Sequence, residues 1–149
     1  MSTNTTSRIA HLEAIHITAT ADTPLSAATK LEGLKTFNPS TAVTLQETKH
    51  LNSEGFSEWE PVWKTASCTL AGECKVGSAT QTVLSNALRN GTAVYVSCID
   101  NPEAASGERK GTRYKLHIES GEEPHEAGAL VTFNYPCKVS GKPVDIITT

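Results

Sequence analysis

The chain has no stretch of apolar residues approaching the roughly 18 that a membrane-spanning helix needs. It also has no excess of basic residues, because 16 Asp and Glu outnumber 13 Lys and Arg and give a formal net charge of -3. Proteins that grip nucleic acid or anionic membranes display clustered Lys and Arg. Residues 1–6 lack the basic-then-apolar order of a secretion signal. We therefore expect a soluble, unexported protein with no membrane contact of its own.

Recognisable catalytic and metal-binding patterns are missing as well. The four cysteines form no CxxC pair, and no His stands at the spacing that completes a zinc site. The histidines have no nucleophile at a motif spacing, and there is no glycine-rich phosphate loop. We expect no catalytic residue, no metal and no cofactor. Cys68, Cys98 and Cys137 lie in apolar strand patterns, where we expect buried, reduced thiols.

The clearest local signal is a helix from about Ser78 to Asn90. Ser78 and Gln81 fit a capping box, in which each side chain satisfies a backbone donor of the first turn, and Gly91 suits the left-handed position after the last turn. One side of this helix is apolar and the other is polar, so it should cover a β-structure with only its stripe buried. The apolar stripe comprises Val83, Leu84, Ala87 and Leu88, and the polar side Thr80, Thr82, Ser85 and Arg89.

Most of the remaining chain shows the period-two alternation of β-strands with one dry face. A weaker strand over residues 30–37 should stop at the turn pair Asn38-Pro39. The length of 149 residues is typical of one domain. We therefore predict a single domain over residues 1–149 with a mainly β, α+β fold: an antiparallel β-sandwich or open barrel with one flanking helix. The alternating segments are 41–48, 61–70, 92–100, 113–119 and 129–139, of which the first two should pair as a hairpin.

Three segments fit no regular element. Residues 1–23 form an N-terminal arm with scattered apolar positions. Residues 47–60 form a long hairpin loop, and residues 144–149 form a C-terminal tail. The N-terminal arm and the C-terminal tail carry too little apolar surface to offset the entropy of ordering, so we expect them to be ordered only against neighbouring subunits. A long loop without its own structure is uncommon in a compact domain and is usually functional.

The hairpin loop carries two aromatic residues, Phe56 and Trp59, among several glutamates. The rings either tuck into the domain's own core or contact another subunit, since aromatic residues are enriched at the centres of interfaces. On the second interpretation this loop makes the contact between stacked subunits and its glutamates seek basic partners. The proposed contact residues are Glu47, Glu54, Phe56, Glu58, Trp59 and Glu60.

Between Leu31 and Val144 the order of short strand, long hairpin, capped helix and three strands resembles the tail tube (major tail) proteins of long-tailed bacteriophages. So do residues 64–72, Lys-Thr-Ala-Ser-Cys-Thr-Leu-Ala-Gly, which look like the strand and turn that precede the helix in that family, and the stripe from Gln81 to Leu88 that ends at Asn90-Gly91.

The resemblance implies a structural virion protein and not an enzyme. Its subunits would form hexameric rings that stack into a tube through which DNA passes during ejection. The resemblance also implies synthesis in the host bacterial cytoplasm, a final place in the phage tail, and contacts with the terminator, tape measure and distal tail proteins. The tube of contractile injection systems shares this fold.

A tube lined by basic residues would bind DNA and slow its passage. The hairpin strands offer a surface of short uncharged side chains, whereas Arg113, Lys115 and His117 form a basic strand face, which we expect to lie away from the bore. The expected lumen-facing residues are Thr44, Gln46, Thr48, Thr65, Ser67 and Thr69.

Two other functions remain open from sequence. A tail terminator or capsid decoration protein would share the setting but would not polymerise alone into long tubes. A small ligand-binding β-barrel or hydrolase, using His117 and the acidic turns around Glu122 and Glu123, would stay monomeric around a filled cavity.

Overall fold

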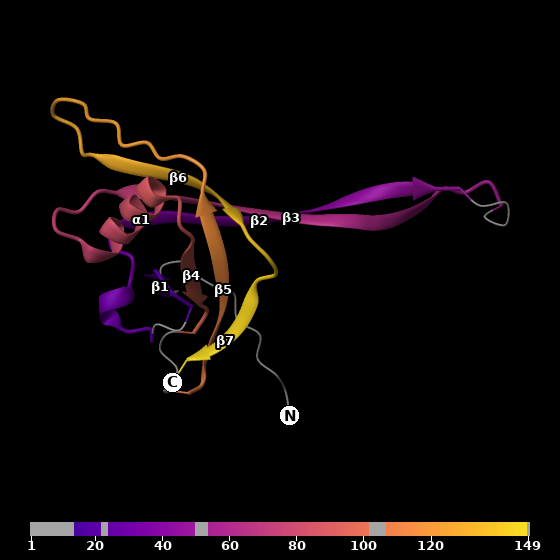
Figure 1. The fold of residues 1–149 in the computed structure, drawn as a ribbon, viewed down its shortest axis with the longest axis horizontal. Helices are drawn as coiled ribbons and strands as arrows, with labels where there is room; N and C mark the ends of the chain where they lie inside the picture. Colours follow the sequence, from indigo (N-terminus) through magenta and orange to yellow (C-terminus); the bar gives the residue numbers. More distant parts are fainter. Residues whose placement is uncertain (1–13, 22–23, 50–53, 102–106, 149) are drawn as a thin grey trace.

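The computed structural model describes residues 14–21, 24–49, 54–101 and 107–148. These residues form a mainly antiparallel β-fold with one α-helix, which confirms the predicted fold class (Figure 1). None of the described helices is long and apolar enough to span a membrane. The elements are β1 (Ala14–Thr18), the 3-10 helix η2 (Ala27–Thr29), β2 (Leu34–Thr48), β3 (Glu58–Glu73), α1 (Ala79–Asn90), β4 (Val94–Ile99), β5 (Arg109–Ile118), β6 (Thr132–Val139) and β7 (Val144–Thr148).

All seven described strands belong to one sheet, in the order β1-β4-β5-β6-β3-β2, and β7 pairs with the half of β5 that β6 does not reach. The chain just before β2 returns to the β1 edge, where the Leu31 N–H donates to the Ile15 carbonyl at 2.9 Å and His16 forms a β-bridge with Lys30. The sheet therefore curls back toward its own first strand. Of the two architectures predicted, the open barrel describes this arrangement and two stacked sheets do not.

The core lies on the inner face of this curled sheet, under α1. Leu70 of β3, Val96 of β4 and Leu116 of β5 have no exposed surface, and neither does Leu84 of α1. The helix packs against β1, β4 and β5. The alternation read from the sequence thus assigns the inward-facing residues of these strands correctly.

Cys68 of β3 and Cys137 of β6 face each other inside this core, and both are almost completely buried. Desolvation raises the pKa of each thiol to about 12, with the neighbouring Cys137 adding to the effect at Cys68 and Glu119 adding to it at Cys137. Both groups therefore stay protonated at neutral pH and behave as small apolar side chains, as predicted.

The helix begins and ends where the sequence predicts. The Ser78 hydroxyl accepts the Gln81 N–H at 3.4 Å, and Gly91, with φ of 66°, donates its N–H to the Ala87 carbonyl. The stripe prediction is wrong for Thr80, which is buried and whose hydroxyl accepts the Glu32 N–H at 3.4 Å.

Gln81 does not close the predicted capping box; its side chain bonds to more distant parts of the chain instead. Its Oε1 accepts the Lys75 N–H at 2.8 Å, while its Nε2 donates to the carbonyls of Glu32 at 2.7 Å and Glu73 at 2.8 Å. One amide thus ties the first turn of α1 to the end of β3 and to the segment that precedes β2.

The predicted turn at Asn38-Pro39 is wrong, because β2 runs through it without a break. Pro39 lies opposite Cys68 within the β2–β3 ladder. Since β2 is an edge strand, a residue without an N–H can occupy it when that position points away from the partner strand. Edge location, which the local sequence does not reveal, makes the proline acceptable.

Two of the segments expected to be irregular contain strands. In the predicted N-terminal arm 1–23, residues Ala14–Thr18 form β1 and pair with β4. Residues 1–13 and 22–23 lie outside the described part. In the predicted tail 144–149, Val144–Thr148 form β7 and pair with β5. Backbone hydrogen bonds to a neighbouring strand order both segments, and in β1 the buried side chain of Ile17 also packs in the core.

Candidate assembly interface

β2 and β3 continue far beyond the rest of the sheet as a two-stranded hairpin, here called the arm (residues 41–66, described except for 50–53). Pairing persists as far as Thr48 and Glu58, whereas β6 reaches β3 only up to Ser67. In the described structure both edges of the arm therefore lack a strand neighbour. The eight β2 residues span about 25 Å at the usual rise per residue, and Figure 1 shows the arm projecting along the longest axis of the molecule. The predicted loop 47–60 is thus too long, because paired strand occupies both of its ends.

One face of the arm continues the inner, core-facing side of the sheet. Starting from the partly buried Phe37 and its buried partner Leu70, alternation along the ladder leads outward to the exposed residues Val43, Leu45, Trp59 and Pro61, with Lys64 opposite Val43. We call these four residues the apolar face of the arm. Trp59 is 59% exposed and Leu45 is 52% exposed. The interpretation that the arm aromatics fold back into the domain's own core is therefore wrong.

The opposite side, the polar face of the arm, holds Thr44, Gln46, Thr48 and Thr65, and the other two residues that we expected to line a lumen, Ser67 and Thr69, continue the same side of β3 into the body of the sheet. The two triplets do not lie opposite each other, however. Thr65 pairs with Ala42, and Thr44 pairs with Trp63. The β3 triplet thus occupies the inner half of one continuous face, and the β2 triplet (Thr44, Gln46 and Thr48) occupies its outer half. The 70%-exposed Trp63, which we did not include, stands between them.

A β-bulge at Val62 decides which tryptophan belongs to which face. Thr44 pairs with Trp63 but the next residue, Leu45, pairs with Pro61, so Val62 is an extra residue on β3. Trp59 and Trp63 are four residues apart and would share a face on a regular strand. The extra residue puts them on opposite faces, which no sequence periodicity indicates.

The proposed contact residues therefore divide among three surfaces. Glu47 and Trp59 lie opposite each other on the apolar side, while Glu58 and Glu60 pair with Thr48 and Gln46 on the polar face. Glu54 and Phe56 lie in the terminal turn, where Phe56 is 76% exposed. Close to that turn the Ser57 hydroxyl donates to Glu47 Oε1 at 2.6 Å.

The basic strand face is not separate from the polar face of the arm. Ser67 on β3 pairs with Lys138 on β6, which in turn pairs with His117 on β5, so all three lie on the same outer side of the sheet. The two faces thus share one side of the curled sheet, and our expectation that the basic face lies away from the bore stays a prediction. Two of the cations on this side interact with other groups: Lys138 Nζ lies 3.9 Å from Glu119 Oε1, and Arg113 Nη1 donates to the Ala21 carbonyl at 3.0 Å.

Charge is unevenly distributed along the hairpin. At its base, Glu73 lies 2.7 Å from Lys35 and 3.6 Å from Lys75, and the hydrogen bond from Lys35 lowers the pKa of this carboxyl most. Near its end, Glu54, Glu58 and Glu60 are exposed. The outer part of the arm thus combines exposed aromatic rings with exposed carboxylates.

The residues considered for a hydrolytic site do not form one chemical centre. His117 lies exposed beside Lys138. The Glu122 backbone pairs with Asn134, and the Glu123 carboxylate accepts a hydrogen bond from the Tyr135 hydroxyl at 3.1 Å. Over the described residues, no three His, Cys, Asp or Glu side chains gather where they could hold a metal ion.

No protein-family model matches the chain, and no curated protein sequence matches it. Solved structures do match. The structure of the SPP1 tail tube, determined by solid-state NMR and cryo-electron microscopy, superposes with a TM-score of 0.73 at 16% identity, over 95% of this chain and 80% of that chain. The chain has the tail tube fold.

Two structures of gene transfer agent particles also match this tail tube fold. A chain of the native virion gives a TM-score of 0.70 at 15% identity, covering 94% of this chain and 99% of that one. A chain from the tail of the empty particle, refined helically with C6 symmetry, gives 0.70 at 13% identity and covers 96% and 100%. The likeness covers nearly the whole chain and lies in the arrangement of the elements.

Proposed function

We propose that this chain is the subunit of a phage tail tube, in which six copies form a ring and stacked rings form a conduit for DNA. The observation that carries the proposal is the arm, whose faces are exposed and whose edges lack strand neighbours within the described chain. The tail tube fold and the C6 symmetry of a structure with that fold support a ring of six. The role is structural and not enzymatic.

The arm has physical reasons to need other copies. Open strand edges pair readily with other chains, and neighbouring arms placed around an axis would satisfy them. The apolar face of the arm would also leave water on assembly, at about 25 cal/mol for each Å² buried. A hairpin of this length is otherwise poorly stabilised, because isolated two-stranded ribbons are marginal in water.

We assign the threonine, serine and glutamine side chains of the polar face to the bore and the apolar face to contacts between subunits. Short hydroxyl and amide side chains give DNA phosphates no fixed cation to bind, so they let DNA slide. Lys138 shares this side of the sheet, and the nearby Glu119 offsets its charge. Trp59 and Phe56 would then anchor the contact between stacked rings.

This role places the protein in the virion tail after synthesis in the host cytoplasm. The ends of such a tube must meet other tail proteins, so we include the terminator, tape measure and distal tail proteins among its partners. DNA passes through transiently, without a sequence-specific contact.

Electron microscopy of the purified protein tests the proposal. We expect hollow tubes whose cross-sections average to six-fold symmetry. Rings that never stack would favour the terminator, and binding to capsids alone would favour a decoration protein. A monomer at every concentration, with a ligand in a cavity, would contradict the structural role and favour the small binding barrel.

A further inference from the structure

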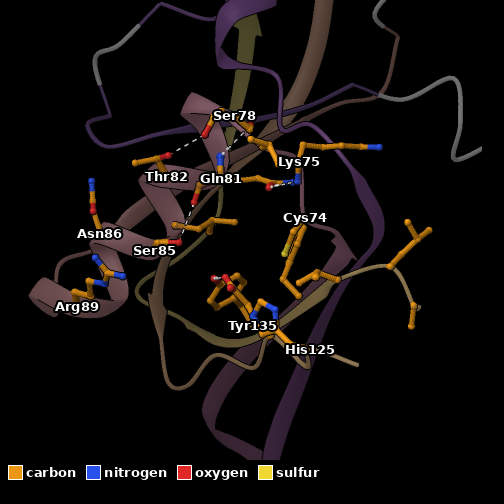
Figure 2. A pocket seen from close by; sticks show the side chains of 18 residues that line it. Cys74, Lys75, Ser78, Gln81, Thr82, Ser85, Asn86, Arg89, His125 and Tyr135 are labelled. Carbon is orange, nitrogen blue, oxygen red and sulfur yellow. Dashed lines mark hydrogen bonds between the residues drawn. The ribbon is translucent and has the colours of Figure 1, made fainter. Parts of the chain in front are cut away.

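A groove lies at the opposite end of the molecule from the tip of the arm. It is bounded by residues 74–78 after β3, by the outer side of α1, and by residues 123–131 before β6, and it has a volume of about 710 Å³ (Figure 2). Leu84, Phe133 and Tyr135 contribute an apolar floor. Nothing in the proposed function so far uses this groove.

The walls of the groove carry exposed apolar groups and two cations. Val76 is fully exposed on one wall and Leu130 is 73% exposed on the other. Lys75 and Arg89 lie at opposite sides of the lining, and Cys74 lies beside Lys75 (Figure 2). Lys75 Nζ is 3.6 Å from Glu73 Oε2, so a glutamate of another copy would share this lysine with Glu73. An apolar floor between two positive groups suits a segment that carries an aromatic ring between two carboxylates.

The arm ends in such a segment. Glu54 and Glu58 stand two residues before and two residues after the exposed ring of Phe56. A volume of about 710 Å³ lies within the range that buries most of a small ligand, and it leaves room for an aromatic side chain. The Glu123 carboxylate, the acid in the lining, is occupied by the Tyr135 hydroxyl at 3.1 Å.

Resting on the proposed tube, we propose that residues 54–60 of one copy seat in the groove of a copy in the next ring, with an aromatic ring over the floor and glutamates directed toward Lys75 and Arg89. The arm tip and α1 lie at opposite ends of the long axis of the molecule (Figure 1). A contact between unlike ends is head-to-tail, and when it does not close on itself it repeats without limit. The same contact would therefore propagate the stack.

Cys74 offers a direct test, because it lines the groove and is the one cysteine that is not buried. Ser57→Cys places a thiol at the arm tip and keeps Phe56 and the glutamates. A short bis-maleimide added to assembled protein should then give a ladder of covalent oligomers. The ladder should be lost in Ser57→Cys combined with Cys74→Ser. It should also be absent from Thr65→Cys, whose thiol lies nearer the arm base on the polar face.

Wild-type protein gives a second readout that needs no substitution. Desolvation raises the pKa of the Cys74 thiol, with Glu123 adding to the effect, so alkylation is best followed at a pH of about 9. Cys74 should react in the monomer and lose that reactivity in tubes. Tubes in which Cys74 still reacts and Ser57→Cys gives no Cys74-dependent ladder would overturn the docking and leave the tube function standing. Failure of wild-type protein to form tubes would instead count against the function itself.

Discussion

At the scale of single residues, the groups that stabilise the fold and those that would stabilise the assembly are different. Gln81 bonds to three backbone groups, so its loss should lower the stability of an isolated subunit. Trp59 projects from the arm with 59% of its surface exposed, so an isolated subunit should hardly register its loss. Two substitutions can therefore test fold and assembly separately.

Trp59→Ala should raise the critical concentration for polymerisation by about 30-fold, which corresponds to on the order of 2 kcal/mol per contact for an aromatic anchor. The thermal unfolding of the monomer should not change. Trp63→Ala, the same change on the opposite face of the arm, is the matched control and should have the smaller effect. An unchanged tube yield from the Trp59→Ala protein would contradict its role as an anchor.

Gln81→Ala should lower the free energy of unfolding of the monomer by about 1–2 kcal/mol, because three partly solvent-accessible hydrogen bonds are lost and each contributes roughly 0.5–1.5 kcal/mol. Urea denaturation of the monomer measures this. Asn86→Ala, at an exposed position of the same helix, should stay within about 0.5 kcal/mol of wild type. Equal midpoints for the two variants would show that water replaces the Gln81 bonds.

At the scale of elements, the sequence predicts those structures whose signals are local. The caps at Ser78 and Gly91 locate α1, and alternation identifies β4, β5 and β6 together with their inward faces. The remaining strands depend on which strand edge they pair with. β1 and β7 exist because β4 and β5 offer them edges, and Pro39 is tolerated because β2 is itself an edge. The same dependence made the candidate site only partly predictable, since neither the bulge nor the shared face of Ser67 and Lys138 is visible before the strands are paired.

Lysines on the polar face of the arm should slow the passage of DNA. Ser67 is a poor position for this test because a lysine there would face Lys138 across the ladder, and like charges in a cross-strand pair are destabilising. Thr44→Lys with Thr65→Lys avoids that pair. We expect particles built from this variant to assemble and then to release DNA more slowly, because each ring repeats the added charges. The Thr44→Gln, Thr65→Gln protein controls for size, and ejection from the lysine variant at the wild-type rate would argue against this face lining the bore.

At the scale of the whole molecule, the arm is separable from the body. The buried cluster draws on β1, β3, β4, β5, β6 and α1, and among the described residues none of its fully buried members lies within 41–66. The arm thus adds an interaction surface without supporting the core. A subunit of this kind can be stable alone and still remain incomplete in function.

Replacing residues 43–64 by Asn-Gly, which joins the paired residues Ala42 and Thr65 through a tight turn, should leave a folded subunit that does not polymerise. A thermal melt followed by circular dichroism would show whether the body survives, and sedimentation would show whether it stays monomeric. Tubes formed by this shortened protein would remove the arm from the assembly mechanism.

The extra residue at Val62 sets which face of the arm the residues between it and the turn occupy. Residues between it and the turn are assigned to inside or outside by the parity of their distance from it, so deleting Glu60 while the bulge stays would move Trp59 to the side of Trp63. Deleting Val62 itself would remove the bulge and leave both tryptophans on their present faces. Insertions and deletions in pairs would preserve the assignment. Descendants of this chain should therefore vary the length of β3 between the body and the tip in steps of two far more readily than in steps of one.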